Sequence, residues 1–111
     1  MEQNTDRTEA IASLNDAFRA SFIGGRVFLT KGVAALDFAR QARLIMAVKT
    51  ASTDIENDPW GEHDFGALDH QGDRYFWKID YYALVSETLS QDPSNPALTR
   101  RVLTIMLADE Y

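Results

Sequence analysis

Two alternating runs on either side of Gln71-Gly72 restrict the fold of this chain more than any other feature. The dipeptide lies between FGALDH and DRYFWKIDYY, and the second run is rich in aromatic residues. Two-residue turns that contain glycine join antiparallel strands with the twist that a sheet requires. The sequence therefore predicts a β-hairpin over residues 65–82.

The turn also sets the register of the hairpin, and the register groups its polar side chains. Continuing the ladder away from the turn places His63 opposite Asp80, with Lys78 on the same face. A carboxylate beside an imidazole favours its charged form and orients the ring. We therefore expect a polar cluster of His63, Lys78 and Asp80, which either fixes the register or forms part of an acid–base site. The opposite face is expected to carry Leu68, Tyr75, Trp77, Ile79 and Tyr81.

Three further segments carry apolar residues with a helical period. A first helix is expected to end at Gly24-Gly25, because glycine favours the left-handed conformation that follows a helix. A second is expected over residues 34–51. The third is expected to begin at Asn95-Pro96, since asparagine suits the N-cap and proline the first helical position.

The remaining segments complete the predicted order of elements. RVFLT, at residues 26–30, is expected to be a short strand, and residues 84–95 an irregular edge strand with a loop. The predicted order is therefore α-β-α-β-β-α. We expect an α+β fold in a small single domain, residues 1–111, with an antiparallel sheet and helices packed mainly on one face. Residues 1–5 are expected to be flexible.

Acidic residues are concentrated in one segment of the chain. Residues 54–73 have a charge of −7, while the rest of the chain has +1. An acidic surface repels nucleic acid, whereas it attracts a basic protein surface or a divalent cation. We expect no direct nucleic-acid binding and an acidic patch that faces a protein partner with a basic surface, with a solvated loop as the alternative. The patch would consist of Asp54, Glu56, Asp58, Glu62 and Asp64.

The segment DPWGEHDFG, at residues 58–66, raises the question of a metal or catalytic site. The preceding DxExD pattern resembles the start of a calcium loop, but Pro59 and Phe65 stand where that loop needs glycine and glutamate. The chain has no cysteine and the hairpin no serine or threonine, so no catalytic residue, metal site or cofactor is assigned. Trp60 is expected to pack at the edge of the core. A single cation held by Asp58, Glu62 and Asp64 remains an alternative.

Composition also bears on the cellular location. The chain lacks cysteine, its first ten residues are polar and charged, and no apolar run approaches the roughly 18–20 residues of a membrane span. We therefore expect a soluble, cytoplasmic protein with no membrane association.

Three sequence blocks carry a resemblance to a known family. DPWGEHDFG, FWKIDYY and TRRVLTIMLADEY resemble, in this order and spacing, the hallmark blocks of short bacterial proteins classified only as a domain of unknown function. The resemblance covers residues 11–111, although Ala83 stands where the family usually has an acid. The family is widespread in proteobacteria and often borne on plasmids and integrative elements, which implies an accessory role. It brings no established activity and transfers no catalytic residue.

Three functional hypotheses follow. The first is a small, acidic, non-enzymatic protein-binding module from mobile DNA. It would act as an anti-defence inhibitor of a nuclease or a nucleic-acid-binding complex, because an acidic face suits a basic channel. The second is a metal-assisted or acid–base enzyme centred on Glu62, His63, Asp64 and Asp80. The third is a homo-oligomeric structural module, with a homodimer formed through the apolar C-terminal helix.

Overall fold

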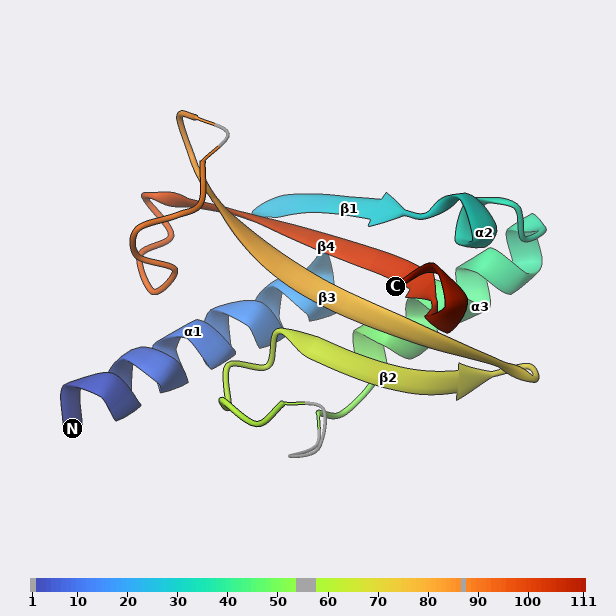
Figure 1. The fold of residues 1–111 in the computed structure, drawn as a ribbon, viewed down its shortest axis with the longest axis horizontal. Coiled ribbons are helices and arrows are strands. Elements are labelled where there is room, and N and C mark those ends of the chain that lie inside the picture. The colour runs from blue at the N-terminus through green and yellow to red at the C-terminus, as the bar shows by residue number, and fades with distance from the viewer. Residues whose placement is uncertain (1, 54–57, 87) are drawn as a thin grey trace.

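The computed structural model describes residues 2–53, 58–86 and 88–111, which form a layer of helices on a sheet (Figure 1). The helices are α1 (Glu2–Ser21), α2 (Lys31–Ala34) and α3 (Phe38–Thr50), and a short 3-10 helix, η1 (Ala108–Glu110), follows the last strand. The strands are β1 (Gly25–Leu29), β2 (Phe65–His70), β3 (Asp73–Ala83) and β4 (Thr99–Leu107). Of the helices described, none is long and apolar enough to cross a membrane.

The strands form a four-stranded mixed sheet in the order β1-β4-β3-β2. β2 and β4 each pair antiparallel with β3, whereas β1 pairs parallel with β4. α1 and α3 pack against one face of this sheet (Figure 1). The prediction of a small α+β domain with helices mainly on one face is therefore confirmed, while the prediction of an antiparallel sheet is wrong for β1.

β2 and β3 form the hairpin that the sequence predicts. The register pairs Phe65 with Lys78, as a two-residue turn requires. Gln71 and Gly72 both have positive φ, at 50° and 90°, which is the backbone of a type I′ turn. The turn and both strands are contiguous in the chain, so the local sequence is sufficient to fix this register.

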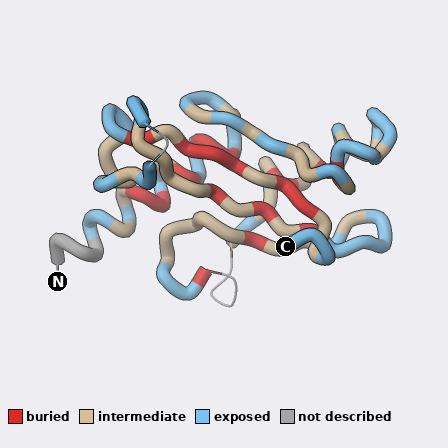
Figure 2. The backbone as a smooth tube through the Cα atoms, turned by 45° about the horizontal axis from the view of Figure 1, so that its top comes forward, coloured by how far each residue is buried: buried red, intermediate tan, exposed pale blue. Residues whose placement is uncertain are grey.

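The core lies between the sheet and the helices, and β3 and β4 supply most of its sheet side. Figure 2 shows the buried segments in red along the strands in the middle of the sheet. Gly66 on β2 lies against Trp77, and a Cβ at this position would overlap the indole ring. The buried members of the core are Phe18, Val33, Leu44, Val48, Tyr75, Trp77, Ile79, Leu103 and Ile105.

The C-terminal segment is a strand and not the predicted helix. β4 lies between β1 and β3 and is buried on both faces. Leu103 and Ile105 belong to the core, and on the other face Val102 is only 8% exposed. A strand buried on both faces reads as a continuous apolar run, which periodicity does not distinguish from a buried helix. The observed order is α-β-α-α-β-β-β, so the predicted homodimer has no C-terminal helix to use.

The second predicted helix is divided in two. The Asp37 side chain accepts a hydrogen bond from the Arg40 backbone N–H at 2.9 Å, which is the geometry of an N-cap. α3 therefore begins at Phe38, and α2 precedes it as a separate short turn after β1.

Candidate functional site

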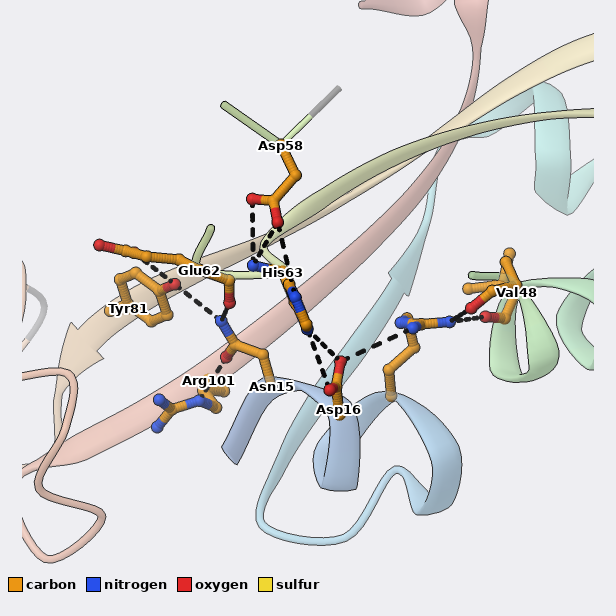
Figure 3. Close-up of polar contacts among 10 residues, drawn as sticks. Asn15, Asp16, Val48, Asp58, Glu62, His63, Tyr81 and Arg101 are labelled. Carbon is orange, nitrogen blue, oxygen red and sulfur yellow. Dashed lines mark hydrogen bonds and ion pairs between the residues drawn. The ribbon is translucent and has the colours of Figure 1, made fainter. Parts of the chain in front are cut away.

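A buried asparagine on α1 is the centre of a polar network that joins this helix to the sheet (Figure 3). Asn15 Nδ2 donates to the Tyr81 hydroxyl at 2.8 Å and to the Glu62 carbonyl at 2.9 Å. Its Oδ1 accepts from Arg101 Nε at 2.7 Å. The Tyr81 hydroxyl donates in turn to the Glu62 carboxylate at 3.0 Å. Both N–H groups and the oxygen of the Asn15 amide are thereby engaged.

Burial changes the proton affinities in this network. It raises the pKa of the Tyr81 phenol far above its ordinary value and lowers the pKa of the Arg101 guanidinium. Arg101 is only 4% exposed, but it also donates to the Pro93 carbonyl at 2.6 Å and lies 5.3 Å from the centroid of the Tyr81 ring. Hydrogen bonds and an aromatic face thus replace the water that a buried charge loses.

His63 forms a second group of contacts beside the first (Figure 3). Its backbone has a positive φ of 57°, and its N–H donates to both oxygens of the Asp58 carboxylate at 3.1 Å. The ring Nδ1 lies 2.9 Å from a carboxylate oxygen of Asp16 on α1. The contact of His63 with Asp16 therefore holds the loop before β2 against α1. The contact of His63 with Asp58 fixes the conformation of the loop.

Arg19, one turn further along α1, joins the helix to the end of α3. Its guanidinium donates to the carbonyls of Val48 and Ala51 at 2.7 Å and 2.6 Å. It also lies 4.5 Å from the centroid of the Trp77 ring and 3.8 Å from Asp16. Burial lowers the pKa of Arg19, although the Asp16 carboxylate acts in the opposite direction.

The predicted pair of His63 and Asp80 is not formed, and this prediction is wrong. The ladder ends where the Ile79 N–H donates to the Asp64 carbonyl at 2.8 Å, and the left-handed backbone of His63 then turns the chain toward α1. Asp80 instead forms an ion pair with Lys78 at 3.3 Å. Two members of the predicted cluster therefore meet, on the opposite face from His63.

The acidic patch has a different geometry from the expected one. Asp54 and Glu56 lie outside the described residues. Asp58 was expected to face a partner, but its side chain is only 5% exposed because it accepts the backbone N–H of the loop. Glu62 and Asp64 are half-buried. The acids that the structure describes in this patch therefore form part of the loop's own packing.

Trp60 is also placed differently from the prediction. Its side chain is 84% exposed, so it does not pack at the edge of the core. Gly61 follows it with a φ of 74°, and the Gly61 N–H donates to the Asp58 carbonyl at 3.1 Å. This tight turn directs the Trp60 side chain into solvent.

The contacts of Asn15, Asp16 and Arg19 hold α1 to the loop before β2, to the sheet and to the end of α3. We call these contacts the structural clamp. Within residues 2–53, 58–86 and 88–111, no three histidine, aspartate or glutamate side chains converge as metal ligands would. The alternative of a cation held by Asp58, Glu62 and Asp64 is therefore not supported by their positions. Glu62 and His63, two residues of the enzyme hypothesis, are both engaged in contacts that fix the loop.

The Asp64 carboxyl, in the loop before β2, is expected to make the stability of the folded state depend on pH. Burial raises the pKa of the Asp64 carboxyl, and the neighbouring Glu62, Asp58 and Asp80 carboxylates raise it further. The folded state thus holds this proton more tightly than the unfolded chain, so the stabilisation is complete below the unfolded pKa and is lost as pH rises through the folded pKa. Asp64→Asn should therefore raise the melting temperature at neutral pH and leave it nearly unchanged in acid.

Thermal unfolding followed by circular dichroism, from acid to neutral pH, measures the change in melting temperature. Asp109→Asn, at an exposed position in η1, is the matched control and should change neither the melting temperature nor its pH dependence. An Asp64→Asn variant that is less stable than the wild type at neutral pH would contradict the assigned cause.

An exposed apolar surface lies away from this network, between β3 and β4. Figure 1 shows this segment projecting beyond the end of the sheet. Its backbone is held by hydrogen bonds from Ala83 N to Thr88 O at 2.7 Å and from Leu84 N to Leu98 O at 3.1 Å. We call its four exposed aliphatic residues the apolar protrusion: Leu84, Val85, Leu89 and Leu98, which are 52%, 95%, 71% and 51% exposed.

A hollow of about 300 Å³ opens among these side chains. The described residues that line it are Ala83, Leu84, Val85, Ser86, Thr88, Leu89, Gln91, Ala97 and Leu98. None of these carries a charge, although charged residues make up 25% of the chain. The sequence predicts only an irregular edge strand and a loop for this segment, and does not identify it as a surface.

The network was likewise missed, but a signal for it exists in the sequence. Asn15 and Arg19 lie four residues apart on the side of α1 that also carries Ile11 and Phe18. A polar residue within an apolar helical stripe faces the core, and a polar side chain that is buried there needs hydrogen-bond partners. Asn15 and Arg19 are therefore candidates for buried polar residues, although the sequence does not identify their partners.

Comparisons with known proteins give a family and no activity. Residues 29–110 match the model of a family described as "Protein of unknown function (DUF3768)". No curated protein and no solved structure matches the chain. The match begins at Leu29, the last residue of β1, and includes the loop before β2, the apolar protrusion and β4, while α1 precedes it.

Proposed function

We propose, from the premise that the chain belongs to the DUF3768 family of proteins of unknown function, that it is a non-enzymatic protein-binding module. The observation that supports this proposal is the apolar protrusion. Val85 is 95% exposed and Leu89 is 71% exposed, on a segment that projects from the sheet. A contiguous apolar surface that is exposed to solvent commonly marks a site of interaction with another molecule.

The chemistry of the hollow is that of the centre of an interface. The centres of protein interfaces are depleted in charged residues and rely on a few apolar anchors. The described lining of the hollow has no charge, and its volume is large enough to accept an apolar side chain of a partner. We therefore place the contact at Val85 and Leu89, with the hollow receiving an apolar side chain.

The charge of the chain selects the kind of partner. The net charge is −6 at pH 7, so a second copy would be repelled, whereas a protein with a basic surface would be attracted. Opposite charge increases the rate of association, and desolvated apolar anchors then determine the rate of dissociation. The occupant of the protrusion is thus a basic protein that presents an apolar side chain.

The basic partner is also given an identity and a cellular role. The protein is an accessory factor of mobile DNA, and its partner is a nuclease or a nucleic-acid-binding complex of host defence. Such partners have basic surfaces because they bind phosphate backbones. This supports the choice of partner, and the role is that of an inhibitor that occupies or distorts the partner.

The experiment uses the whole chain as bait in a bacterial lysate that contains defence nucleases. Three baits are compared: wild type, Val85→Ser with Leu89→Ser, and a control with Ile23→Ser and Phe38→Ser. The control removes two apolar side chains that are 79% and 85% exposed elsewhere on the surface. A protein retained by wild type and control is then purified and titrated with each variant by calorimetry.

We expect the protrusion variant to bind this protein at least about tenfold more weakly than wild type, as loss of an interface anchor requires. The captured protein should lose nuclease or nucleic-acid-binding activity when wild type is added, and retain it with the protrusion variant. Equal affinity of the protrusion and control variants would refute the proposed surface. A protrusion variant that differs from wild type only in self-association would instead assign the surface to a homodimer.

A further inference from the structure

The sheet face that points away from α1 and α3 carries a second hollow, of about 530 Å³. Its floor is formed by Val102 and Thr104 on the central strand β4. Arg26 and Phe28 on β1 lie opposite these two residues and have longer side chains. Longer side chains also lie on β3, the other neighbour of β4. Short residues in the middle and long residues on either side produce the depression. The residues on β3 are Lys78, Asp80 and Tyr82, and Arg100 closes one end.

The chain itself covers the other half of this face. The rings of Phe65, Phe76 and the C-terminal Tyr111 pack together, with centroid distances of 5.3, 5.6 and 5.5 Å. Met106 on the same face of β4 is only 3% exposed. The hollow therefore lies in the half of the face that the chain leaves uncovered.

The charges around the hollow favour an anionic ligand. Three cations and one acid line it, and the acid, Asp80, is paired with Lys78 at 3.3 Å. In the part of the chain that the structure describes, neither Arg26 nor Arg100 forms an ion pair. The Nε of Arg100 is buried and has no hydrogen-bond partner among the described residues. A buried donor without a partner is unfavourable, so binding of an acceptor at this guanidinium is favoured.

The two neighbouring arginines of β4, Arg100 and Arg101, have different surroundings. Arg101 points to the helix side, where Asn15 and the Pro93 carbonyl satisfy it. Arg100 lies on the opposite side of the same strand without such partners. The planar guanidinium of arginine matches the oxygens of phosphate and carboxylate groups in a bidentate manner.

Aromatic rings lie beside these cations. Phe28 is 53% exposed, although it is a large apolar residue on a strand, and Tyr82 lies across the sheet next to Arg100. An aromatic ring accepts a nucleobase by stacking, irrespective of the base. The two kinds of group together provide for a phosphate and for a flat ring within one hollow.

We propose that this hollow binds a nucleoside phosphate, with the phosphate at Arg26 and Arg100 and the base on Phe28 or Tyr82. The ligand is of mononucleotide size, because ligand sites of about 300–1,000 Å³ hold single small molecules. A long strand would extend beyond the hollow over a chain of net charge −6, which repels phosphates. The site is separate from the apolar protrusion, so either proposal stands without the other.

The experiment titrates the intact chain with the four ribonucleoside 5′-monophosphates, the corresponding nucleosides and inorganic phosphate. Amide chemical shifts report where each probe binds, and calorimetry reports the affinity at low and at physiological salt. At least one nucleotide should bind about tenfold more tightly than its nucleoside or phosphate alone, with shifts on β1, β3 and β4. Arg100→Gln and Phe28→Ser should each weaken this binding by about tenfold.

Two controls remove the same groups elsewhere. Arg43→Gln, at an exposed position on α3, loses the same charge, and Phe38→Ser loses the same ring; both should leave nucleotide affinity unchanged. Arg26→Gln, at an exposed position, replaces Arg100→Gln if the latter does not fold. The proposal is overturned if phosphate binds as tightly as every nucleotide, if Arg43→Gln weakens binding as much as Arg100→Gln, or if only long single strands bind.

Discussion

Replacing Asn15 with leucine is expected to lower the free energy of unfolding by about 3 kcal/mol, which would be one of the largest effects of any single substitution in this chain. Asn15 is fully buried and accepts from Arg101, which is only 4% exposed. Hydrogen bonds to charged groups contribute roughly 1.5–3 kcal/mol, and a buried donor left unpaired adds its desolvation cost. The Tyr81 hydroxyl and the Glu62 carbonyl lose their donor in the same variant.

Urea unfolding followed by circular dichroism measures this change, with Ser13→Leu on the exposed side of α1 as the control. The control is expected to stay within about 0.5 kcal/mol of wild type, as most surface substitutions do. Adding Arg101→Met to Asn15→Leu should cost less than the sum of the two single changes, because the orphaned charge is then absent. Additive losses would show that Asn15 and Arg101 do not depend on each other.

The hairpin could be predicted because its information is local. The turn residues and both strands are contiguous, so the positive φ values at Gln71 and Gly72 determine which side chains face each other. The core residues of β3 follow directly from this register. Alternation with a period of two then assigns Tyr75, Trp77 and Ile79 to the buried face without any knowledge of the helices.

β4 could not be predicted in this way because its partners are distant. It pairs with β1, more than seventy residues earlier in the chain, and its apolar run fits a helix and a strand equally. Asn95 does accept a backbone hydrogen bond, as a helix N-cap would, but the strand β4, and not a helix, follows it. The Asn95 side chain accepts from Ala97 N at 2.9 Å, which is a local turn of the kind asparagine forms without a following helix.

The site shows the same division between local and distant information. The hairpin register was correct up to Phe65, but the prediction extended the ladder two residues too far, to His63. The partner of the His63 ring is Asp16, 47 residues away, and Asn15 and Arg101 are 86 residues apart. Only the positions of Asn15 and Arg19 within an apolar helical stripe can be recognised from the sequence. The exposed apolar protrusion required the structure, since exposure of an aliphatic residue cannot be read from its type.

Replacing Arg19 with methionine is expected to lower the free energy of unfolding by about 3–4 kcal/mol, since two charge-assisted hydrogen bonds are lost together. Arg19 is 6% exposed, and its guanidinium holds the Val48 and Ala51 carbonyls at the end of α3. The last carbonyls of a helix lack the usual intrahelical partner, and the Ala51 N–H reaches the Val48 carbonyl only at 3.4 Å. Methionine preserves the apolar stem of the side chain but donates nothing, so both carbonyls lose their charged donor.

Arg19→Lys separates geometry from charge in the same unfolding measurement. Arg19 donates to both carbonyls from the same nitrogen, Nη1. Lysine keeps the positive charge and a donor, but lacks the planar guanidinium that stacks at 4.5 Å on the Trp77 ring. We expect it to recover less than half of the stability lost in Arg19→Met. Arg43→Met, at an exposed position on α3, should change stability by no more than about 0.5 kcal/mol. Full recovery with lysine would mean that charge near the α3 C-terminus, and not the planar guanidinium, joins α1 to α3.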